Sequence, residues 1–501
     1  MKNSNYLSLI NRVALTWIAT MSLATQATAA KSLQGQKPNI VVIMPDDISF
    51  GSIQAYGGSK PSPNIDRLYR QSLRFEDFHV SPTCSPARAS LLTGRHECYA
   101  GVTHTINMRD RLSLKSRTLA DMLKAAGYTT GIFGKWHLGD EAPYRPDRRG
   151  FDEVYIHGAG GIAQNYPHSA DFPNNDYNNP VLYHNGKAIE TKGFCTDLFF
   201  DQAIRWIGQT REAGKPFFCY IPPNVNHGPH IPPILPDGSK GDSMVNLDDN
   251  VGKMMKFLDE SGLSEDTLLI YLTDNGANSG SKGFRGGKGS PYEGGTRVPC
   301  LMYWKGKIEG GIDCERLTGH IDFYPTFAEL AGSDAPVPGN KAWDGRSILP
   351  LMENPAADWQ PRHWITHKTR WRDAASSKYS QCAIRDFRYK LVMPKAGVQE
   401  LYDLEKDAHE RENIAKEHPQ IVAALKKSYD AWWEDIQPHM VNDHLTNVPE
   451  TLKPYHEIYR RDFGQTRYEE AMRLMTWTGG KPYGNAKKKR RNRQSKGRKK
   501  Q

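Results

Sequence analysis

The chain has 501 residues, enough for a large hydrophobic core and about two domains. Its formal net charge is +10, but the segment Lys487–Lys500 alone contains ten Lys and Arg residues and no acid. The remaining body is therefore close to neutral. This argues against a folded domain that binds nucleic acid or other polyanions by charge.

Residues 1–30 have the pattern of a secretory signal peptide. Lys2 and Arg12 supply positive charge, Val13–Ala24 is an apolar stretch, and Ala27–Ala29 offers small residues for cleavage. The apolar stretch is too short to span a bilayer, and no later stretch is long and apolar enough. We expect a periplasmic or secreted protein; a disordered or anchored N-terminus is the alternative.

Seven cysteines are present, and no two of them have the spacing of a zinc ribbon. An oxidising compartment would permit disulfides. With Cys84 set aside, Cys300 and Cys314 are the nearest pair along the chain, but the sequence does not decide the pairing.

The first predicted strand, Ile40–Met44, is a continuous apolar run, which is typical of a buried parallel strand. Asp46 and Asp47 follow it, at the strand end where open α/β sheets bind ligands. Adjacent carboxylates repel each other unless a cation or protons compensate. The pair suits a hard-cation site, although a helix cap and turn would use the same residues.

After a predicted helix at Asn64–Gln71, a second one is expected from about Pro86 to Leu92, because proline suits the first helical position. Its N-terminus would present free backbone N–H groups and the positive dipole end beside Cys84, which favours an anion. Arg88 can turn back toward the same side. A nucleophile and a guanidinium would then share one corner; a buried cysteine at a helix start is the simpler alternative.

A helix at Arg117–Ala126 leads to a strand at Thr129–Phe133, which runs into Lys135 and His137. Alternate positions on an extended segment share a face. A lysine and a histidine delivered together suit an oxyanion, whereas either one alone would be interpreted as a surface or structural residue. The Asn-, Gly- and Pro-rich region His157–Asn185 is predicted to be irregular, as a substrate loop or as an insertion.

A helix at Thr196–Thr210 and a buried strand at Lys215–Ile221 come next, and His227 follows the strand end. His230 is close enough to compete for the same role. The following helix, Met244–Ser261, carries the adjacent acids 248 and 249, which we expect to be solvated.

The strand Thr267–Leu272 delivers Asp274 and Asn275. With Asp46 and Asp47 they form an all-oxygen set, which suits Ca²⁺ or Mg²⁺ and disfavours zinc or copper. A thiolate beside a hard cation would be unusual, and converting the cysteine at position 84 to an oxygen-bearing group removes the mismatch.

The segment Gly283–Pro299 is glycine-rich, so its backbone can approach a ligand closely, with Lys288 as a positive tip. It lacks the Gly-Lys-Ser/Thr spacing of a phosphate-binding P-loop. Thr318–Gly332 is predicted as a turn followed by a helix.

From about residue 361 the pattern changes to short strands and a helix near Pro419–Ile436. We expect a large catalytic domain over 31–360, a smaller α+β domain over 361–450, and an extension over 451–501 that ends in a disordered basic tail. The tail could make a weak, salt-sensitive contact with an anionic polysaccharide or membrane surface, or be solvated. His367, Arg370 and Trp371 could rim the active site, although such residues are more often surface or packing residues.

The string Cys84-Ser85-Pro86-Ala87-Arg88, followed by Leu91-Leu92-Thr93-Gly94-Arg95, resembles the signature of the type I sulfatases. The segments Gly134–Gly139 and Gly286–Gly295 resemble further elements of that family, as does His227. The similarity extends over about Pro38 to Ala415. It implies an alkaline-phosphatase-like α/β fold, with a large mixed sheet flanked by helices and a smaller C-terminal antiparallel sheet plus helix.

The resemblance implies a sulfuric ester hydrolase that uses a Cα-formylglycine made from Cys84 and one bound Ca²⁺, with Mg²⁺ less suited. One hydroxyl of the formylglycine hydrate would attack sulfur, and the second would let the aldehyde re-form and release sulfate. The implied metal ligands are Asp46, Asp47, Cys84 in its oxidised form, Asp274 and Asn275. The implied catalytic residues are Cys84, Arg88 and Lys135 on the sulfate, His137 as the base for sulfate elimination, and His227 and Lys288 on the leaving group.

The implied partners are a sulfated carbohydrate, more than an aryl sulfate, and a formylglycine-generating maturase. A phosphonate monoester or phosphodiester hydrolase of the same superfamily is the main alternative. A non-catalytic binder of sulfated glycans and a nucleic-acid binder acting through the tail are less consistent with these motifs.

Overall fold

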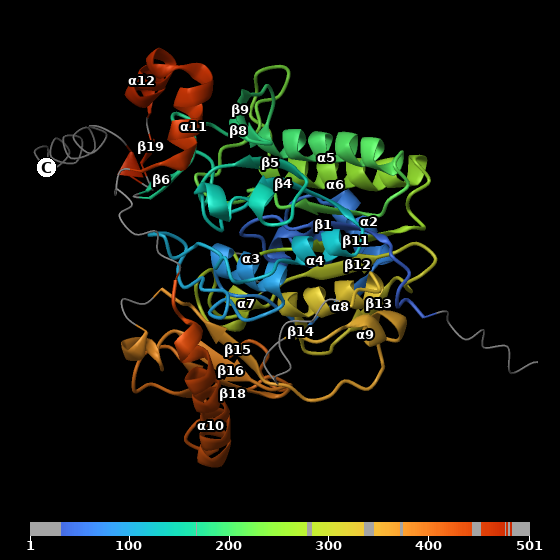
Figure 1. Cartoon of the computed structure of the whole chain (residues 1–501). Coiled ribbons are helices and arrows are strands. Elements are labelled where there is room, and N and C mark those ends of the chain that lie inside the picture. The colour runs from blue at the N-terminus through green and yellow to red at the C-terminus, as the bar shows by residue number, and fades with distance from the viewer. Residues whose placement is uncertain are drawn as a thin grey trace, which may run out of the picture. The chain divides into compact units, whose positions relative to one another are not determined.

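The computed structural model describes residues 32–166, 168–277, 283–334, 345–370, 374–442 and 452–475, and the backbone of 477–478 and 481–482. The chain forms two units, residues 1–33 and 34–501, and all described helices and strands belong to the second (Figure 1). The predicted signal peptide, Trp371 and the basic tail lie outside the described residues. Among the residues described, no helix combines the length and the apolar character that crossing a bilayer requires.

A ten-stranded mixed sheet forms the centre of the larger unit, in the order β13-β2-β12-β11-β1-β10-β4-β5-β8-β9. The five neighbouring strands from β11 to β5 run parallel, and β12 and β8 pair with them antiparallel. The strands are β1 (Asn39–Ile43), β2 (Leu73–Phe75), β4 (Thr129–Lys135), β5 (Glu153–His157), β8 (Val181–His184), β9 (Lys187–Glu190), β10 (Phe217–Ile221), β11 (Thr267–Leu272), β12 (Cys300–Tyr303) and β13 (Ile312–Cys314).

Helices cover both faces of this sheet, as Figure 1 shows. On one face, α5 (Cys195–Arg211) and α6 (Ser243–Glu260) pack on the sheet and on each other, with α2 (Pro63–Gln71) beside α6. On the other face lie α3 (Cys84–Thr93), α4 (Leu119–Ala125) and α8 (Phe323–Leu330). The apolar strands predicted from the sequence are buried between these layers, so the predicted large mixed sheet flanked by helices is confirmed.

The smaller elements complete the fold. Two short pairs, β3 with β14 and β6 with β7, lie outside the large sheet, and β19 pairs with β20. Their bounds, with those of two short helices, are β3 (Phe78–His79), β6 (Asn165–Tyr166), β7 (Ser169–Ala170), β14 (Thr318–Gly319), β19 (Trp477–Thr478), β20 (Lys481–Pro482), α7 (Glu293–Thr296) and α9 (Leu349–Glu353).

A separate four-stranded antiparallel sheet comes later in the chain than the large sheet. Its strands are β15 (Trp364–His367), β16 (Cys382–Arg385), β17 (Tyr389–Met393) and β18 (Glu400–Asp403). The helix α10 (Pro419–Ile436) buries its apolar side against it. This confirms the predicted C-terminal antiparallel sheet with a helix. After it, α11 (Pro454–Phe463) and α12 (Gln465–Leu474) pack on each other, and α11 contacts β9 and β7.

Buried ion pairs join the small sheet to the segment that follows β2 and to the short helix α7. Arg385 donates to both carboxylate oxygens of Asp77 at 2.9 Å, and Lys390 is 2.7 Å from Glu293. The carboxylates of Asp77 and Glu293 also lie close enough to His79 to form a possible metal cluster. Because Arg385 and Lys390 already balance these carboxylates, the cluster is better explained as a structural contact.

Two expectations from the sequence are wrong in detail. Asp248 on α6 is buried rather than solvated, and its carboxylate accepts the backbone N–H groups of Asn64 and Ile65 at the start of α2. The region predicted to be irregular before Asn185 contains β6 to β8. These strands are short: β6 and β7 form a local hairpin, and β8 pairs with the neighbouring β9 and with β5. Segments of two to four residues give too little alternation to stand out from the Asn-, Gly- and Pro-rich composition.

The seven cysteines are all buried and free in the structure. None of the disulfides that an oxidising compartment would permit is formed among them. Four of the thiols lie on strands of the two main sheets: Cys219, Cys300, Cys314 and Cys382.

Glu97 is a buried acid that makes stability depend on pH. Its carboxylate accepts hydrogen bonds from Ser81 at 2.8 Å and from Ser90 on α3 at 3.0 Å, and burial raises its pKa to about 7. The folded state therefore holds this proton more tightly than the unfolded chain, so its contribution to stability is lost as pH rises from about 4.5 to 7. The loss amounts to about 3 kcal/mol.

We expect Glu97→Gln, which stays neutral, to lack this loss. Urea unfolding at several pH values between 5 and 8 gives the free energy of unfolding of wild type and variant. Subtracting the wild-type value from the variant value removes the contribution of all other titrating groups and leaves that of Glu97. The difference should grow in favour of the variant up to about pH 7 and then level off. A difference that stays constant with pH would contradict the assignment.

Candidate active site

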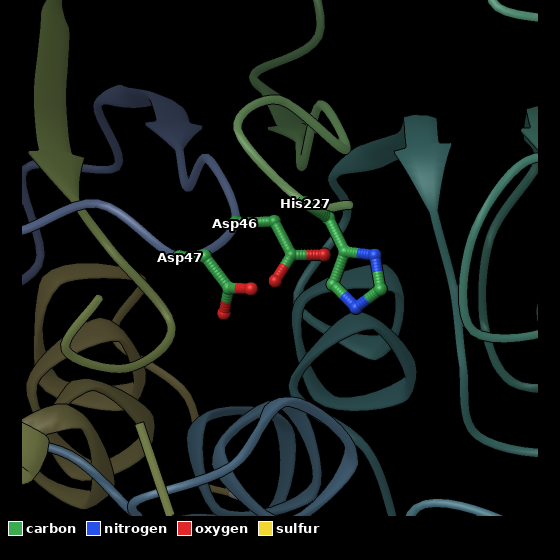
Figure 2. Close-up of side chains that lie close together, drawn as sticks. All are labelled: Asp46, Asp47 and His227. Atoms are coloured by element: carbon green, nitrogen blue, oxygen red, sulfur yellow. The ribbon is translucent and has the colours of Figure 1, made fainter. Parts of the chain in front are cut away.

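The site lies where the carboxyl ends of four parallel strands meet. Asp46 and Asp47 follow β1, Lys135 ends β4, His227 follows β10, and Asp274 and Asn275 follow β11. Because β11, β1, β10 and β4 are neighbours in one parallel block, their ends open on the same edge of the sheet. Figure 2 shows the side chains of Asp46, Asp47 and His227 facing one shared space from two different loops.

Every carboxylate at this edge contacts a cation or an amide. Asp46 is fully buried and forms an ion pair with Lys135 through one oxygen. Asp47, which has a φ of 57°, accepts from Lys288 and from the Asn275 side chain, both at 2.7 Å. Asp274 accepts from the Arg88 guanidinium at 2.8 Å.

Their pKa values are driven in opposite directions. Burial alone would raise the pKa of Asp46, but Lys135, His227 and Lys288 hold it well below its usual range. Burial and the neighbouring Asp46 charge raise the pKa of Asp274 well above its usual range, against the effect of Arg88. The two buried acids therefore compete for positive charge, as acids in a shared metal or proton site do.

Two buried oxygens at this edge have no hydrogen-bond partner among the described residues: Asp46 Oδ1 and Asn275 Oδ1. Buried acceptors without a partner are costly, so such atoms call for a ligand. Ligand atoms of Asp46, Asp47 and His227 also lie within 4.8 Å of one another. The donor set is mostly oxygen, which fits a hard divalent cation.

Cys84 is the first residue of α3, with Thr83 as the extended N-cap. The helix begins two residues earlier than predicted, so Cys84 lies within its first turn rather than just outside it. Arg88, one turn further, donates to the Lys135 carbonyl at 2.9 Å as well as to Asp274. Its guanidinium therefore fixes the start of α3 against β4 and β11, beside a helix N-terminus that favours an anion.

His137 is held as a neutral ring. Its Nε2 lies 2.8 Å from the Thr105 carbonyl oxygen, so Nε2 carries the proton and Nδ1 keeps its lone pair. Burial, aided by the Lys135 charge, lowers the pKa of His137 to about 3. The Nδ1 atom is buried and has no described partner, which leaves it available as a proton acceptor.

His227 has the opposite arrangement. Its Nδ1 lies 2.8 Å from the Gly228 carbonyl oxygen, so Nε2 keeps the lone pair in the neutral ring. Burial lowers its pKa to about 4, with Lys135 and Lys288 adding to the effect and Asp46 opposing it. Lys288, in contrast, has its pKa raised above the usual value: burial would lower it, but Cys84, Asp47 and Asp46 outweigh burial.

A cavity of about 470 Å³ opens over these groups. Its walls include five of the predicted site residues: Asp47, Cys84, His137, His227 and Lys288. The other five lie buried and are joined to this set by the contacts above: Asp46, Arg88, Lys135, Asp274 and Asn275. The predicted residues are therefore brought together around one cavity.

Other wall residues were not predicted. His104, Thr105, Gln164, Tyr166 and Asn226 come from loops and from the short strand β6, and no sequence pattern marks them. His230 and Arg370, considered from the sequence, also line the cavity. His367 does not, because it is buried and its ring lies beside Trp433.

Comparison with known families and curated proteins identifies relatives of this chain. A family model described as sulfatase matches residues 38–333, and one described as N-sulphoglucosamine sulphohydrolase, C-terminal, matches residues 287–444. Arylsulfatase A of Bos taurus is 33% identical over 415 residues, 75% of this chain and 77% of that protein. Arylsulfatase A of Homo sapiens is 31% identical over 80% of this chain and 89% of that protein.

Comparison with solved structures also finds related proteins. Ps i-CgsB, solved in complex with k-i-k-neocarrahexaose, matches with a TM-score of 0.69 and 26% identity over 87% of this chain and 99% of that one. The phosphonate monoester hydrolase of Agrobacterium radiobacter shares the fold, with a TM-score of 0.54 and 21% identity over 81% and 96%. With the family model covering more than half of its length, this chain belongs to the sulfatase family, whose enzymes hydrolyse sulfate esters.

Proposed function

We propose that this sulfatase releases inorganic sulfate from a sulfated carbohydrate, using a Cα-formylglycine at position 84 and one bound divalent cation, for which calcium is best suited. The observation that carries the proposal is the single cavity on which Cys84, His137, His227 and Lys288 converge. The carbohydrate is supported by a solved relative in complex with a neocarrahexaose and by a canine relative named N-acetylgalactosamine-6-sulfatase, 32% identical over 63% of this chain.

The cation would be held by Asp46, Asp47, Asp274 and Asn275, together with the oxidised side chain at position 84. The unpartnered oxygens of Asp46 and Asn275 support this choice, since both are buried and lack any described donor. When bound, the cation supplies Lewis-acid stabilisation and orients the sulfate. Lys135, which contacts Asp46, would keep that carboxylate ionised for this purpose, and Lys288 contacts Asp47.

Position 84 is suited to carry the nucleophile. As a hydrated aldehyde it would supply one hydroxyl to attack sulfur and a second to release the sulfate afterwards. The α3 N-terminus, Arg88 and Lys135 bring a helix dipole and two cations to the same place, which stabilises the charge of a bound sulfate.

Two neutral histidines would handle protons. The free lone pair at Nδ1 of His137 suits a base that removes the proton from the second hydroxyl during sulfate elimination. Lys288, which stays charged, lines the same cavity and is suited to donate a proton or a positive charge to the departing sugar oxygen. His227 lies on the same wall and would donate to that oxygen only after its Nε2 has taken up a proton.

Sulfate release tests this function. With enzyme from a host that contains the maturase, we expect turnover of p-nitrophenyl sulfate, slower than turnover of at least one defined sulfated oligosaccharide. The alternative, a phosphonate monoester or phosphodiester hydrolase, predicts the reverse preference on a p-nitrophenyl phosphodiester. Faster phosphodiester cleavage than sulfate release would favour that alternative.

Gly160 offers a test of the role of His137. A Cβ added at Gly160 would lie 2.5 Å from Cε1 of His137, so Gly160→Ala must displace the imidazole. We expect kcat on p-nitrophenyl sulfate to fall about 10- to 100-fold, because a shift of about 1 Å in a catalytic group has effects of this size. The matched control is Gly208→Ala on α5, where an added Cβ meets nothing within 4 Å. Equal activity of both variants would contradict a catalytic role for His137.

A further inference from the structure

The outer part of the cavity holds a cation that the reaction does not use. Arg370 lines the cavity with its side chain exposed, and it comes from the loop after β15 of the small sheet rather than from the large sheet. The residues around it on the wall are His104, Thr105 and Tyr166. Of these, only Thr105 is tied to the proposed chemistry, because its carbonyl oxygen holds the ring of His137.

The backbone before Arg370 is firmly held. Thr369 is fully buried with a φ of 59°, and its N–H donates to Nδ1 of His367 at 3.1 Å. Nε2 of His367 lies 3.2 Å from the Ser377 carbonyl oxygen. The guanidinium itself donates from Nη2 to Thr105 Oγ1 at 2.9 Å. An exposed side chain anchored at both ends is pre-organised for binding.

The charge of Arg370 is not balanced within the described part of the chain. Lys288, the other cation of the cavity wall, pairs with Asp47, whereas no carboxylate is found within ion-pair distance of Arg370 among the residues described. A guanidinium has five N–H donors, and a single hydrogen bond to Thr105 leaves the others for a ligand. Its planar fork matches the paired oxygens of a carboxylate or a sulfate.

His104 adds a neutral donor beside this cation. Its Nδ1 accepts the backbone N–H groups of Thr105 at 2.8 Å and Ile106 at 3.1 Å, which places the proton of the neutral ring on Nε2. Burial, and then the Arg370 charge, lowers the pKa of His104 to about 4, so the ring is neutral at pH 7. A hydrogen-bond donor therefore lies beside the Arg370 guanidinium, whose other N–H groups have no partner in the part of the chain that the structure describes.

We propose that Arg370 and His104 form a second anion subsite, which binds a carboxylate or a further sulfate on the sugar, in addition to the sulfate ester that is cleaved. The inference rests on the proposed function, because it assumes that the cavity holds a sulfated carbohydrate. It makes the substrate class an anionic saccharide with at least two negative groups. The small C-terminal sheet, through the loop after β15, then contributes to substrate choice.

Binding to the full-length Cys84→Ala protein tests this subsite without turnover. The probes are a disaccharide of a sulfated hexosamine and a uronic acid, its carboxyl-reduced form, and monosulfated and disulfated disaccharides without uronate. Titration calorimetry gives each Kd. The probes form two pairs: the uronate disaccharide with its carboxyl-reduced form, and the disulfated with the monosulfated disaccharide. With Arg370 present, we expect the doubly anionic probe of at least one pair to bind about 10- to 100-fold more tightly than the singly anionic one, which is the size of a charged hydrogen-bonded pair.

Arg370→Gln in the same background should abolish that preference, and Arg370→Lys should retain only part of it. Lys368→Gln is the matched control, because it removes a cation two residues earlier that does not line the cavity, and it should keep the full preference. A preference in the uronate pair identifies a carboxylate, and one in the sulfated pair identifies a second sulfate.

Equal Kd values within both pairs while Arg370 is present, or an unchanged preference in Arg370→Gln, would overturn the proposal. So would the absence of binding by all four probes. Failure of the proposed function is a separate result, since it would appear as lack of sulfate release by the enzyme with an intact residue 84. Thermal melting of each variant shows whether a lost preference reflects lost folding.

Discussion

Replacement of Cys84 by alanine is expected to abolish sulfate release while leaving the protein folded. The side chain is buried at the first turn of α3, and the cavity, the cations and the helix N-terminus all meet there. Alanine fills almost the same space but cannot become an aldehyde hydrate. Because loss of a nucleophile removes the whole covalent route, we expect kcat on p-nitrophenyl sulfate to fall by about 10⁴-fold or more.

Cys84→Ser gives a sharper version of the same experiment. A serine has one hydroxyl where the aldehyde hydrate has two, so it could accept a sulfo group but could not expel it. Mass spectrometry of the active-site peptide should find the aldehyde in the wild-type enzyme made with a maturase, and a trapped sulfate ester in the serine variant. Cys314→Ala, a buried thiol on the edge strand β13, is the control and should keep full activity.

A fully active enzyme whose peptide carries an intact thiol at position 84 would contradict the mechanism. So would an active Cys84→Ala protein. Either result would leave the family membership unchanged, because that rests on the match over residues 38–333. It would instead remove residue 84 from the chemistry.

The sequence predicts the site well where geometry follows from strand order. Ile40–Met44 and Thr267–Leu272 are apolar runs that could only be buried, and the polar residues after them had to lie at strand ends. In a parallel block such ends share one edge, so Asp46 and Asp274 meet although they are far apart along the chain. Here a local pattern was enough to predict a long-range contact.

The sequence fails where the determining contact is distant and leaves no local signal. Asp248 looks like a solvated helix residue, yet it accepts the N–H groups that begin α2, which lies more than 180 positions earlier in the chain. The outer wall of the cavity is similar, since His104 and Tyr166 come from two separate segments that no pattern marks, whereas Arg370 was considered from the sequence and does line the cavity. No periodicity or spacing links these residues, and only the packing of the small sheet beside the large one brings them together.

Removal of the divalent cation is expected to have the second-largest effect. We expect a chelator to lower kcat by about 10³-fold and added Ca²⁺ to restore it, because a Lewis acid at a developing charge contributes several kcal/mol. Bound cation should also stabilise the fold, by about 2.7 kcal/mol at a concentration one hundred times its Kd. Thermal melting with and without Ca²⁺ measures that contribution separately from turnover.

Asp46→Asn should remove both responses, since it takes away a buried carboxylate whose second oxygen lacks any described partner. The matched variant is Asp248→Asn, which alters another buried carboxylate, one on α6 that accepts the N–H groups at the start of α2. It should melt at a lower temperature than wild type and still gain the same stabilisation from Ca²⁺. If chelated enzyme free of metal by elemental analysis kept full activity, the four polar residues at the strand ends would serve only to position Lys135 and Lys288. The unpartnered oxygens of Asp46 and Asn275 argue against that outcome, because both are buried at the same strand edge and a buried acceptor without a donor is costly.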